Sequence, residues 1–256
     1  MIFETHAHFD DKRFDEDRDD ILSNLEKYGI ETVINIGADI RGCKASIELA
    51  EKYERVYASL GVHPDEIEGL TDTDYEWIEQ IALFNPKVVA IGECGLDYYR
   101  GRPDEEKKNQ AYHFKRHIEL AEKVNLPLVI HSRDAAEDTF NILKNIKKEM
   151  PGVVHCYSYS PEMAREYVKR GWYIGVGGVV TFKNAKNLVK TVEEIDISRI
   201  LLETDSPYLA PEPHRGERND SRYLVHVVDK IAEIKGMSKE DVVDITSENA
   251  HRLFGI

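Results

Sequence analysis

The feature that most restricts what this chain can fold into is a regular alternation of two kinds of segment. Short runs rich in β-branched residues are each followed by a turn and then by a longer amphipathic stretch. The runs predict buried strands, and the stretches predict helices. The eight predicted strands cover residues 2–9, 32–38, 56–63, 88–95, 127–133, 152–158, 173–180 and 200–207.

Helical patterns fill the intervals between these strands and continue after the last one. Strands that alternate with helices form parallel βα units. Eight units predict an α/β fold, a single (β/α)8 TIM barrel over residues 1–256 with an extra C-terminal helix, for which Ser238 is the predicted N-cap. The predicted helices lie near residues 16–28, 42–53, 73–84, 105–124, 135–149, 161–170, 184–194, 221–235 and 238–253.

A doubly wound open sheet is the alternative arrangement of such units. It normally carries a glycine-rich phosphate loop after its first strand. This chain instead has HAHFDD at residues 6–11, so the barrel is favoured.

Composition narrows the class of protein. No stretch approaches the ~18 consecutive apolar residues of a membrane span, and the N-terminus lacks a secretory signal pattern. Three cysteines without CxxC spacing argue against a disulfide framework. We therefore expect a cytoplasmic enzyme or binding protein, with no membrane role and no obligate protein partner. The net charge of −14 argues against a basic surface that grips long nucleic acid, but not against a substrate held by metal ions and a few arginines.

Metal-ligand side chains gather at the predicted C-terminal ends of the strands, where barrel enzymes carry their reactive groups. Five of the ten histidines fall there, whereas chance would scatter more of them onto helices and loops. In chain order, the residues at these ends are His6, His8, His63, Glu93, His131, His155 and Asp205.

Most of these residues are typical ligands of a divalent metal ion. A single histidine at a strand end is usually a hydrogen-bonded core residue, but six ligand-type residues at one edge predict a shared site. Six ligands are more than one tetrahedral ion can accept, and they suit two ions ~3.5–4 Å apart that are bridged by a carboxylate. Glu93 is the expected bridge, and Mg²⁺, Mn²⁺ and Zn²⁺ all remain open. The six are His6, His8, Glu93, His131, His155 and Asp205.

Two further acids share a strand face with these ligands. Glu4 alternates with His6 and His8, and Glu203 alternates with Asp205. Both are expected one layer below the ligands, where a carboxylate can orient a ligand or its neighbours by hydrogen bonds.

Polar side chains that suit an anionic substrate follow the same strand ends. Tyr98 follows the fourth strand and Arg133 the fifth, and Arg215 and Arg218 lie in PEPHRGERNDSR at 211–222. Because a guanidinium matches phosphate or carboxylate, these arginines predict an anion-binding patch.

Seven motifs are spread over nearly the whole chain: THAHFD (5–10), GVHP (61–64), IGECGLDYY (91–99), VIHSRDA (129–135), HCYS (155–158), LLETDSPYLAP (201–211) and HRGERN (214–219). In these motifs and in their order the chain resembles the TatD family of metal-dependent deoxyribonucleases. The resemblance implies a TIM barrel of the metallo-dependent hydrolase superfamily, a cytoplasmic location and a divalent-metal site for hydrolysis of DNA phosphodiesters.

The resemblance also assigns roles by motif. It implies that His63 contacts substrate rather than metal. The segments HCYSYS and RNDS depart from the usual family pattern, and both lie in loops expected to face the substrate. For the metals, it implies His6, His8 and Asp205 on one ion, His131 and His155 on the other, and Glu93 on both.

The mechanism expected from these residues is metal-assisted phosphodiester hydrolysis. Asp205 would accept the proton of the attacking water, and Arg133 or one of Arg215 and Arg218 would hold non-bridging phosphate oxygens. The resemblance favours single-stranded DNA or 3′ ends, cut as a 3′–5′ exonuclease.

Two other functions remain open at this point. The same metal site could hydrolyse an amide or ester, for example in the deacylation of aminoacyl-tRNA. The chain could also be a metal-bearing scaffold that acts through partners, although a scaffold has no need of six convergent ligands.

Overall fold

The strands form one closed parallel barrel in the computed structural model, which describes residues 1–99, 101–146 and 152–256. β1 and the chain after β8 close it: the His8 N–H donates to Ser206 O at 2.8 Å and the Asp205 N–H to His6 O at 2.9 Å. The predicted (β/α)8 fold is confirmed. The strands, in spatial order, are β1 (Ile2–Ala7), β2 (Ile30–Ile36), β3 (Val56–Leu60), β4 (Val88–Asp97), β5 (Leu128–Arg133), β6 (Gly152–Val154), β7 (Tyr173–Val176) and β8 (Ile200–Leu202).

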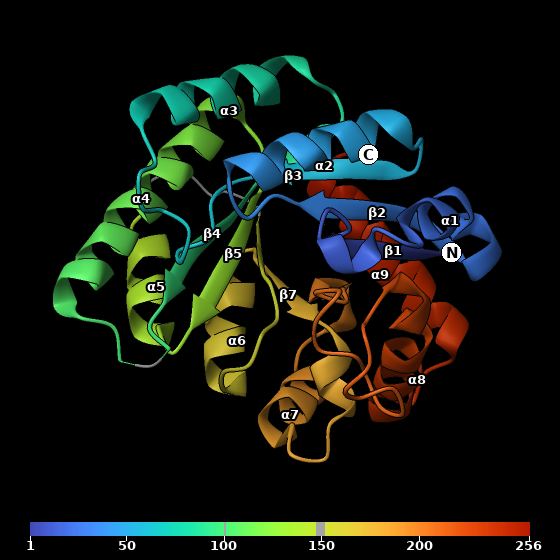
Figure 1. The fold of residues 1–256 in the computed structure, drawn as a ribbon. Coiled ribbons are helices and arrows are strands. Elements are labelled where there is room, and N and C mark those ends of the chain that lie inside the picture. Colours follow the sequence, from blue (N-terminus) through green and yellow to red (C-terminus); the bar gives the residue numbers. More distant parts are fainter. Residues whose placement is uncertain (100, 147–151) are drawn as a thin grey trace.

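Helices surround the strands (Figure 1). Within the described residues, no helix combines the length and the apolar content that a membrane crossing requires. The α-helices are α1 (Arg18–Ser23), α2 (Ile40–Lys52), α3 (Asp72–Phe84), α4 (Asp104–Val124), α5 (Ala136–Leu143), α6 (Pro161–Lys169), α7 (Lys186–Glu194), α8 (Leu224–Lys235) and α9 (Lys239–Phe254). Short 3-10 helices are η1 (Lys12–Phe14), η2 (Leu25–Tyr28), η3 (Gly178–Thr181), η4 (Ile197–Arg199) and η5 (Ser221–Tyr223).

Several boundaries differ from the predicted ones. β6 and β8 end earlier than predicted, and the chain then turns at Cys156 (φ 44°) and Asp205 (φ 57°), which have left-handed conformations that no strand contains. The helix predicted over 16–28 is divided into α1 and η2. Of the helix predicted over 135–149, residues 147–149 lie outside the described residues. The predicted cap is confirmed, because the Ser238 hydroxyl accepts the Asp241 N–H at 3.0 Å.

The barrel interior is apolar at its N-terminal end and polar at the other end. Val129, Val153 and Leu201 belong to a buried cluster that joins inner strand residues to α9. Two positions further along the chain come His131 on β5, His155 just after β6 and Glu203 just after β8, because side chains in extended backbone alternate with a period of two. The apolar layer is thus a floor beneath the polar layer.

Helix α9 closes this floor from below. Its Ala250, Leu253 and Phe254 pack into the inner cluster, and the Phe254 ring stacks on Phe3 with centroids 6.1 Å apart. The Ser247 hydroxyl accepts the Phe3 N–H at 3.2 Å, which ties the helix to β1. The extra C-terminal helix predicted from the sequence is therefore part of the barrel core.

Replacing the aromatic side chain at the base of the barrel should destabilise the protein. Phe254 is 5% exposed, so Phe254→Ala removes buried contacts and should lower the free energy of unfolding by about 3–5 kcal/mol. Phe84, at the end of α3, is 78% exposed, and Phe84→Ala should change it by less than about 0.5 kcal/mol. Urea unfolding measures both, and equal losses would contradict the role of α9.

Candidate metal centre

The first group of predicted ligands converges at the mouth of the barrel, between β1, β4 and β8. His6 Nε2 and His8 Nε2 lie 3.3 Å apart. Glu93 Oε2 is 3.5 Å from the first nitrogen and 3.8 Å from the second. Asp205 Oδ1 is 3.7 Å and 3.5 Å from the same two atoms. Four donor atoms from three strands or strand ends therefore face one small volume.

The second group lies on the other side of the same glutamate. His131 Nδ1, on β5, and His155 Nε2, just after β6, are 3.3 Å apart. Glu93 Oε1 is 2.8 Å from His131 Nδ1 and 2.6 Å from His155 Nε2. Each carboxylate oxygen of Glu93 thus faces one of the two groups of histidines.

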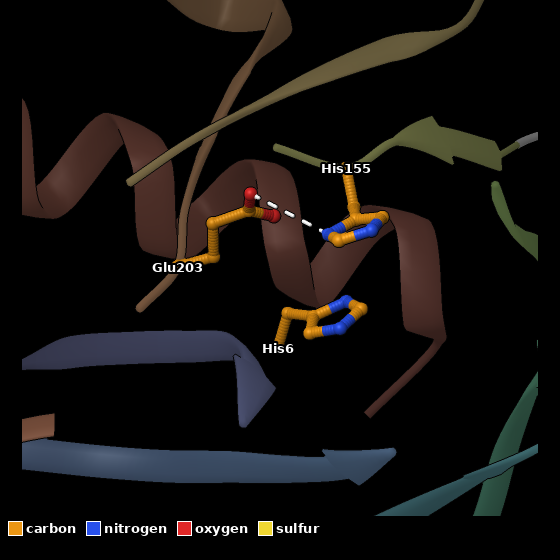
Figure 2. Close-up of side chains that lie close together, drawn as sticks. All are labelled: His6, His155 and Glu203. Atoms are coloured by element: carbon orange, nitrogen blue, oxygen red, sulfur yellow. Dashed lines mark ion pairs between the residues drawn. The ribbon is translucent and has the colours of Figure 1, made fainter. Parts of the chain in front are cut away.

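This arrangement fits divalent metal ions. Imidazole nitrogens packed against carboxylate oxygens are the mixed donor set that Zn²⁺ and Mn²⁺ accept. The groups His6–His8–Glu93 and Glu93–His131–His155 each present donor atoms within 4.8 Å of one another. The rings of His6 and His155 lie face to face, with centroids 3.9 Å apart, so the two groups adjoin (Figure 2).

The electrostatics of the first group depend on burial and on neighbouring charges. Burial and then the His155 charge lower the pKa of His6 to about 4, which keeps that ring neutral and able to bind a metal. Burial opposes protonation of His8 too, but the hydrogen bond to Asp205 and the charges of Glu93 and Asp205 outweigh it and raise the pKa to about 9.

The second group and the carboxylates follow the same pattern. At His131, burial is outweighed by hydrogen bonds to Asp97 and Glu93, and the pKa rises to about 9. For Glu93 and Asp205, burial raises the pKa, but the adjacent histidines hold both values below the usual range. In the absence of a metal, protonated imidazoles therefore supply the positive charge that the buried Glu93 and the partly buried Asp205 need.

One residue beside the ligands was not assigned a role from the sequence. Asp97, at the end of β4, accepts a hydrogen bond from His131 Nε2 at 3.0 Å, which turns Nδ1 towards Glu93. A carboxylate on the second nitrogen of a ligand histidine fixes its tautomer and orientation. Its position in the sequence could have indicated this role, because Asp97 follows Glu93 by four residues on the same strand.

The two acids predicted beneath the ligands are both buried. Glu4 Oε1 accepts the His6 N–H at 3.1 Å and the Thr204 N–H at 2.9 Å, so it joins β1 to the chain before Asp205. Burial, the largest influence on each, raises the pKa of Glu4 to about 8 and that of Glu203 to about 7.

Glu203 lies behind the second group. It accepts the Cys156 N–H, and its Oε1 is 3.9 Å from His155 Nδ1 (Figure 2). Gly175 on β7 makes room for it, because a Cβ there would come within 2.3 Å of Glu203 Oε2. Both acids hold the backbone beside a ligand, as Asp205's neighbour Thr204 and His155's neighbour Cys156 show.

The predicted substrate residues are placed differently from one another. His63 lies at the mouth, with its ring edge-to-face on His131 at 4.3 Å between centroids. Tyr98 is turned towards α5, where its hydroxyl donates to Asp138 at 2.9 Å. It lines a groove of about 680 Å³ between α4 and α5.

The three arginines also differ. Arg133 lies 3.7 Å from the centroid of the Tyr99 ring and Arg215 lies 4.0 Å from that of Phe182, and neither forms an ion pair with another described residue. Arg218 donates to both carboxylate oxygens of Asp17 at 2.6 Å, so its charge is already paired.

Sequence and structure comparisons agree with this geometry. The family model described as TatD related DNase matches residues 3–255. The chain belongs to the TatD family. It is 41% identical to the uncharacterized metal-dependent hydrolase YabD of Bacillus subtilis, with all of both chains covered. Its identity to YcfH of Escherichia coli, which has the same description, is 34% over all of this chain and 96% of that one.

A solved structure of the TatD family shares the fold. YJJV, a TatD homologue from Escherichia coli K12, superimposes with a TM-score of 0.92 at 28% identity, covering 100% of this chain and 98% of that one. The family match and the structural match each cover nearly the whole chain, so both apply to the complete barrel.

The affinity of this centre for Zn²⁺ should depend on pH. Below pH ~9 His8 and His131 are protonated in the metal-free protein, so a metal must displace those protons. The apparent affinity should therefore rise between about pH 6 and pH 9, measured by competition with a chromophoric chelator. Calorimetry in buffers of different ionisation enthalpy would count the protons released.

Variants provide the control for this pH dependence. His8→Gln should release fewer protons on Zn²⁺ binding, whereas His226→Gln, on α8 outside the centre, should match the wild type. An affinity that stays constant over this pH range in the wild type would contradict the protonated state of the centre.

Proposed function

We propose that this chain, acting as one domain over residues 1–256, is a divalent-metal-dependent deoxyribonuclease that shortens single-stranded DNA or 3′ ends in the 3′–5′ direction. The observation that carries the proposal is the position of Glu93, whose two oxygens each face a separate group of histidines. A carboxylate between two groups of ligands suits a pair of ions, the arrangement used by many phosphodiesterases.

The ligands divide between two ions. His6, His8 and Asp205 would hold the first, His131 and His155 the second, and Glu93 both. When bound, such ions lower the pKa of a water and stabilise charge on phosphoryl oxygens. Mg²⁺, Mn²⁺ and Zn²⁺ are the candidates.

The residue that we assign as general base is Asp205. Adjacent histidines hold its pKa below the usual range in spite of burial, so its carboxylate is ionised at neutral pH. An ionised carboxylate beside the attacking water can accept that water's proton as the new P–O bond forms. Its position is fixed by the bond from its own N–H to His6 O.

We assign substrate phosphates to Arg133 and Arg215. Both arginines are exposed, each places its guanidinium carbon over an aromatic ring, and each carries a charge that no ion pair among the described residues neutralises. A guanidinium binds phosphate oxygens in a fork, and an adjacent ring can stack with an unpaired base. Such pairs suit a single strand and help to explain how a protein with a net charge of −14 could hold DNA.

The first test is hydrolysis of a 5′-labelled single-stranded oligonucleotide by metal-stripped protein, with Mg²⁺, Mn²⁺ or Zn²⁺ added back. Stepwise shortening from the 3′ end is expected, only with metal. Asp205→Asn should reduce the rate at least about 100-fold because its amide cannot accept the proton. Asp244→Asn, an exposed acid on α9, should leave the rate unchanged.

The same metal-loaded preparation distinguishes DNA hydrolysis from the alternative reaction, hydrolysis of an amide or ester. If protein that has bound two metal ions per chain leaves DNA intact but hydrolyses an aminoacyl ester, the nuclease proposal is wrong and the site is that of a carbonyl hydrolase. An unaffected rate in Asp205→Asn would remove that residue from the mechanism.

Loss of a phosphate-binding arginine should weaken substrate binding rather than slow the chemical step. Arg215→Ala and Arg133→Ala should each raise KM with little change in kcat, because an interaction shared by ground state and transition state is lost. The slope of log(kcat/KM) against log[KCl] should become shallower by about 0.7 for each contact.

Two controls accompany this series. Arg252→Ala, on α9 at the opposite end of the barrel, should leave both KM and the slope unchanged. Arg218→Ala should lower the melting temperature and leave KM nearly unchanged, since the Arg218 guanidinium is bound to Asp17. A change in kcat alone for Arg215→Ala would contradict the assignment.

A further inference from the structure

Helix α4 carries three buried polar side chains on the face that it packs against the barrel. Gln110, His113 and His117 are 3%, 8% and 1% exposed, on a face where helices normally present apolar residues. Burial of such groups is costly unless each is hydrogen-bonded. The hydrogen-bond partners of these three side chains therefore indicate the role of the polar face of α4.

Gln110 bonds to two segments beside the candidate metal centre, the end of β4 and the loop after β3. Its Oε1 accepts the Asp97 N–H at 2.9 Å, and its Nε2 donates to Asp97 O at 3.1 Å. The same nitrogen lies 3.4 Å from Pro64 O, in the loop after β3. One side-chain amide thus fixes both backbone groups of Asp97 and reaches the residue after His63.

His117 holds the same β3 loop from the other side. Its Nε2 accepts the Val62 N–H at 3.1 Å, and its Nδ1 donates to His113 O at 2.8 Å. Both ring nitrogens are thereby used, with the proton on Nδ1. Val62 and Pro64 are the two chain neighbours of His63, so α4 bonds to both sides of that histidine.

The two segments held by α4 meet at one ligand. Asp97 accepts a hydrogen bond from His131 Nε2 at 3.0 Å, and the His63 ring packs on His131 at 4.3 Å. His131 Nδ1 then faces Glu93 Oε1 at 2.8 Å. The direction of His131 therefore depends on where the backbones of Asp97 and His63 lie.

We propose that Gln110 and His117 are positioning residues, which act through Asp97 and His63 to aim His131 Nδ1 at Glu93. The proposal rests on the proposed function only for its effect on DNA cleavage, because the orientation of His131 is a property of the protein itself. Removal of partners that orient a metal ligand typically costs about 10–100-fold in metal affinity or activity.

His113 provides a matched control on the same helix face. Its Nδ1 bonds to the Tyr75 hydroxyl of α3 at 2.9 Å, not to the loops around His131. His113→Leu therefore removes a buried imidazole, as His117→Leu does, but it keeps the hydrogen bonds that hold Asp97 and the neighbours of His63. Both His113→Leu and His117→Leu should lower the melting temperature, since each removes a side-chain acceptor from a buried donor, the Tyr75 hydroxyl in the first case and the Val62 N–H in the second.

The experiment compares Gln110→Leu, His117→Leu, His117→Gln and His113→Leu. Zn²⁺ affinity is measured by chelator competition, and the ring ¹⁵N shifts of His131 are recorded in the metal-free protein. Gln110→Leu and His117→Leu should weaken Zn²⁺ binding at the group His131–His155–Glu93 by about tenfold or more. The His131 shifts should change, and kcat at saturating Zn²⁺ should fall by a similar factor. KM should change less than kcat.

The remaining variants separate positioning from stability. His117→Gln keeps an acceptor near the Val62 N–H and should recover most of the affinity, and His113→Leu should retain wild-type affinity, shifts and kcat. If His113→Leu loses as much as His117→Leu, or if His117→Leu leaves affinity and shifts unchanged, the proposal is overturned. If the wild type cleaves no DNA, the proposed function fails, while the affinity and the shifts still decide this proposal.

Discussion

The structure depends on the burial of one charged carboxylate at the centre of the barrel mouth. Glu93 is 3% exposed, and its two oxygens are surrounded by four imidazoles. An isolated carboxylate in such surroundings would be strongly destabilising, so positive charge must lie on both of its sides. Protons on histidines can supply that charge, and so can divalent ions. The site is therefore one in which cations and protons compete for the same nitrogens.

That constraint extends to the residues around the ligands. Each imidazole has to point a chosen nitrogen at Glu93, and the surrounding residues determine which one. Asp97 does so for His131, and the Ile36 carbonyl does so for His8, through Nδ1 at 3.0 Å. Gly175 leaves the space in which Glu203 can lie behind His155. Much of the polar interior thus serves orientation, and the apolar floor beneath it supplies the stability.

The sequence predicted the barrel and the six converging residues because both follow from strand geometry. Parallel strand ends meet at one edge, and a period of two aligns His6 with His8. The partners that decide orientation could not be predicted in this way. Pairing Asp97 with His131 requires the register of β4 against β5, and pairing Arg218 with Asp17 requires contact between residues about 200 positions apart. Gln110 and His117 lie on a helix whose buried face is recognisable only once its neighbours are known.

The closure of the barrel by α9 has a consequence for the synthesis of the chain. His6 and His8 are synthesised before the other ligands, whereas Asp205 and the helix that fills the floor are synthesised after all eight strands. Domains that need their last segment in order to close cannot finish folding while that segment is still being made. A growing chain therefore carries isolated histidines and no assembled centre. Whatever this site hydrolyses, its centre can assemble only after Asp205 and α9 have been synthesised and have left the ribosome.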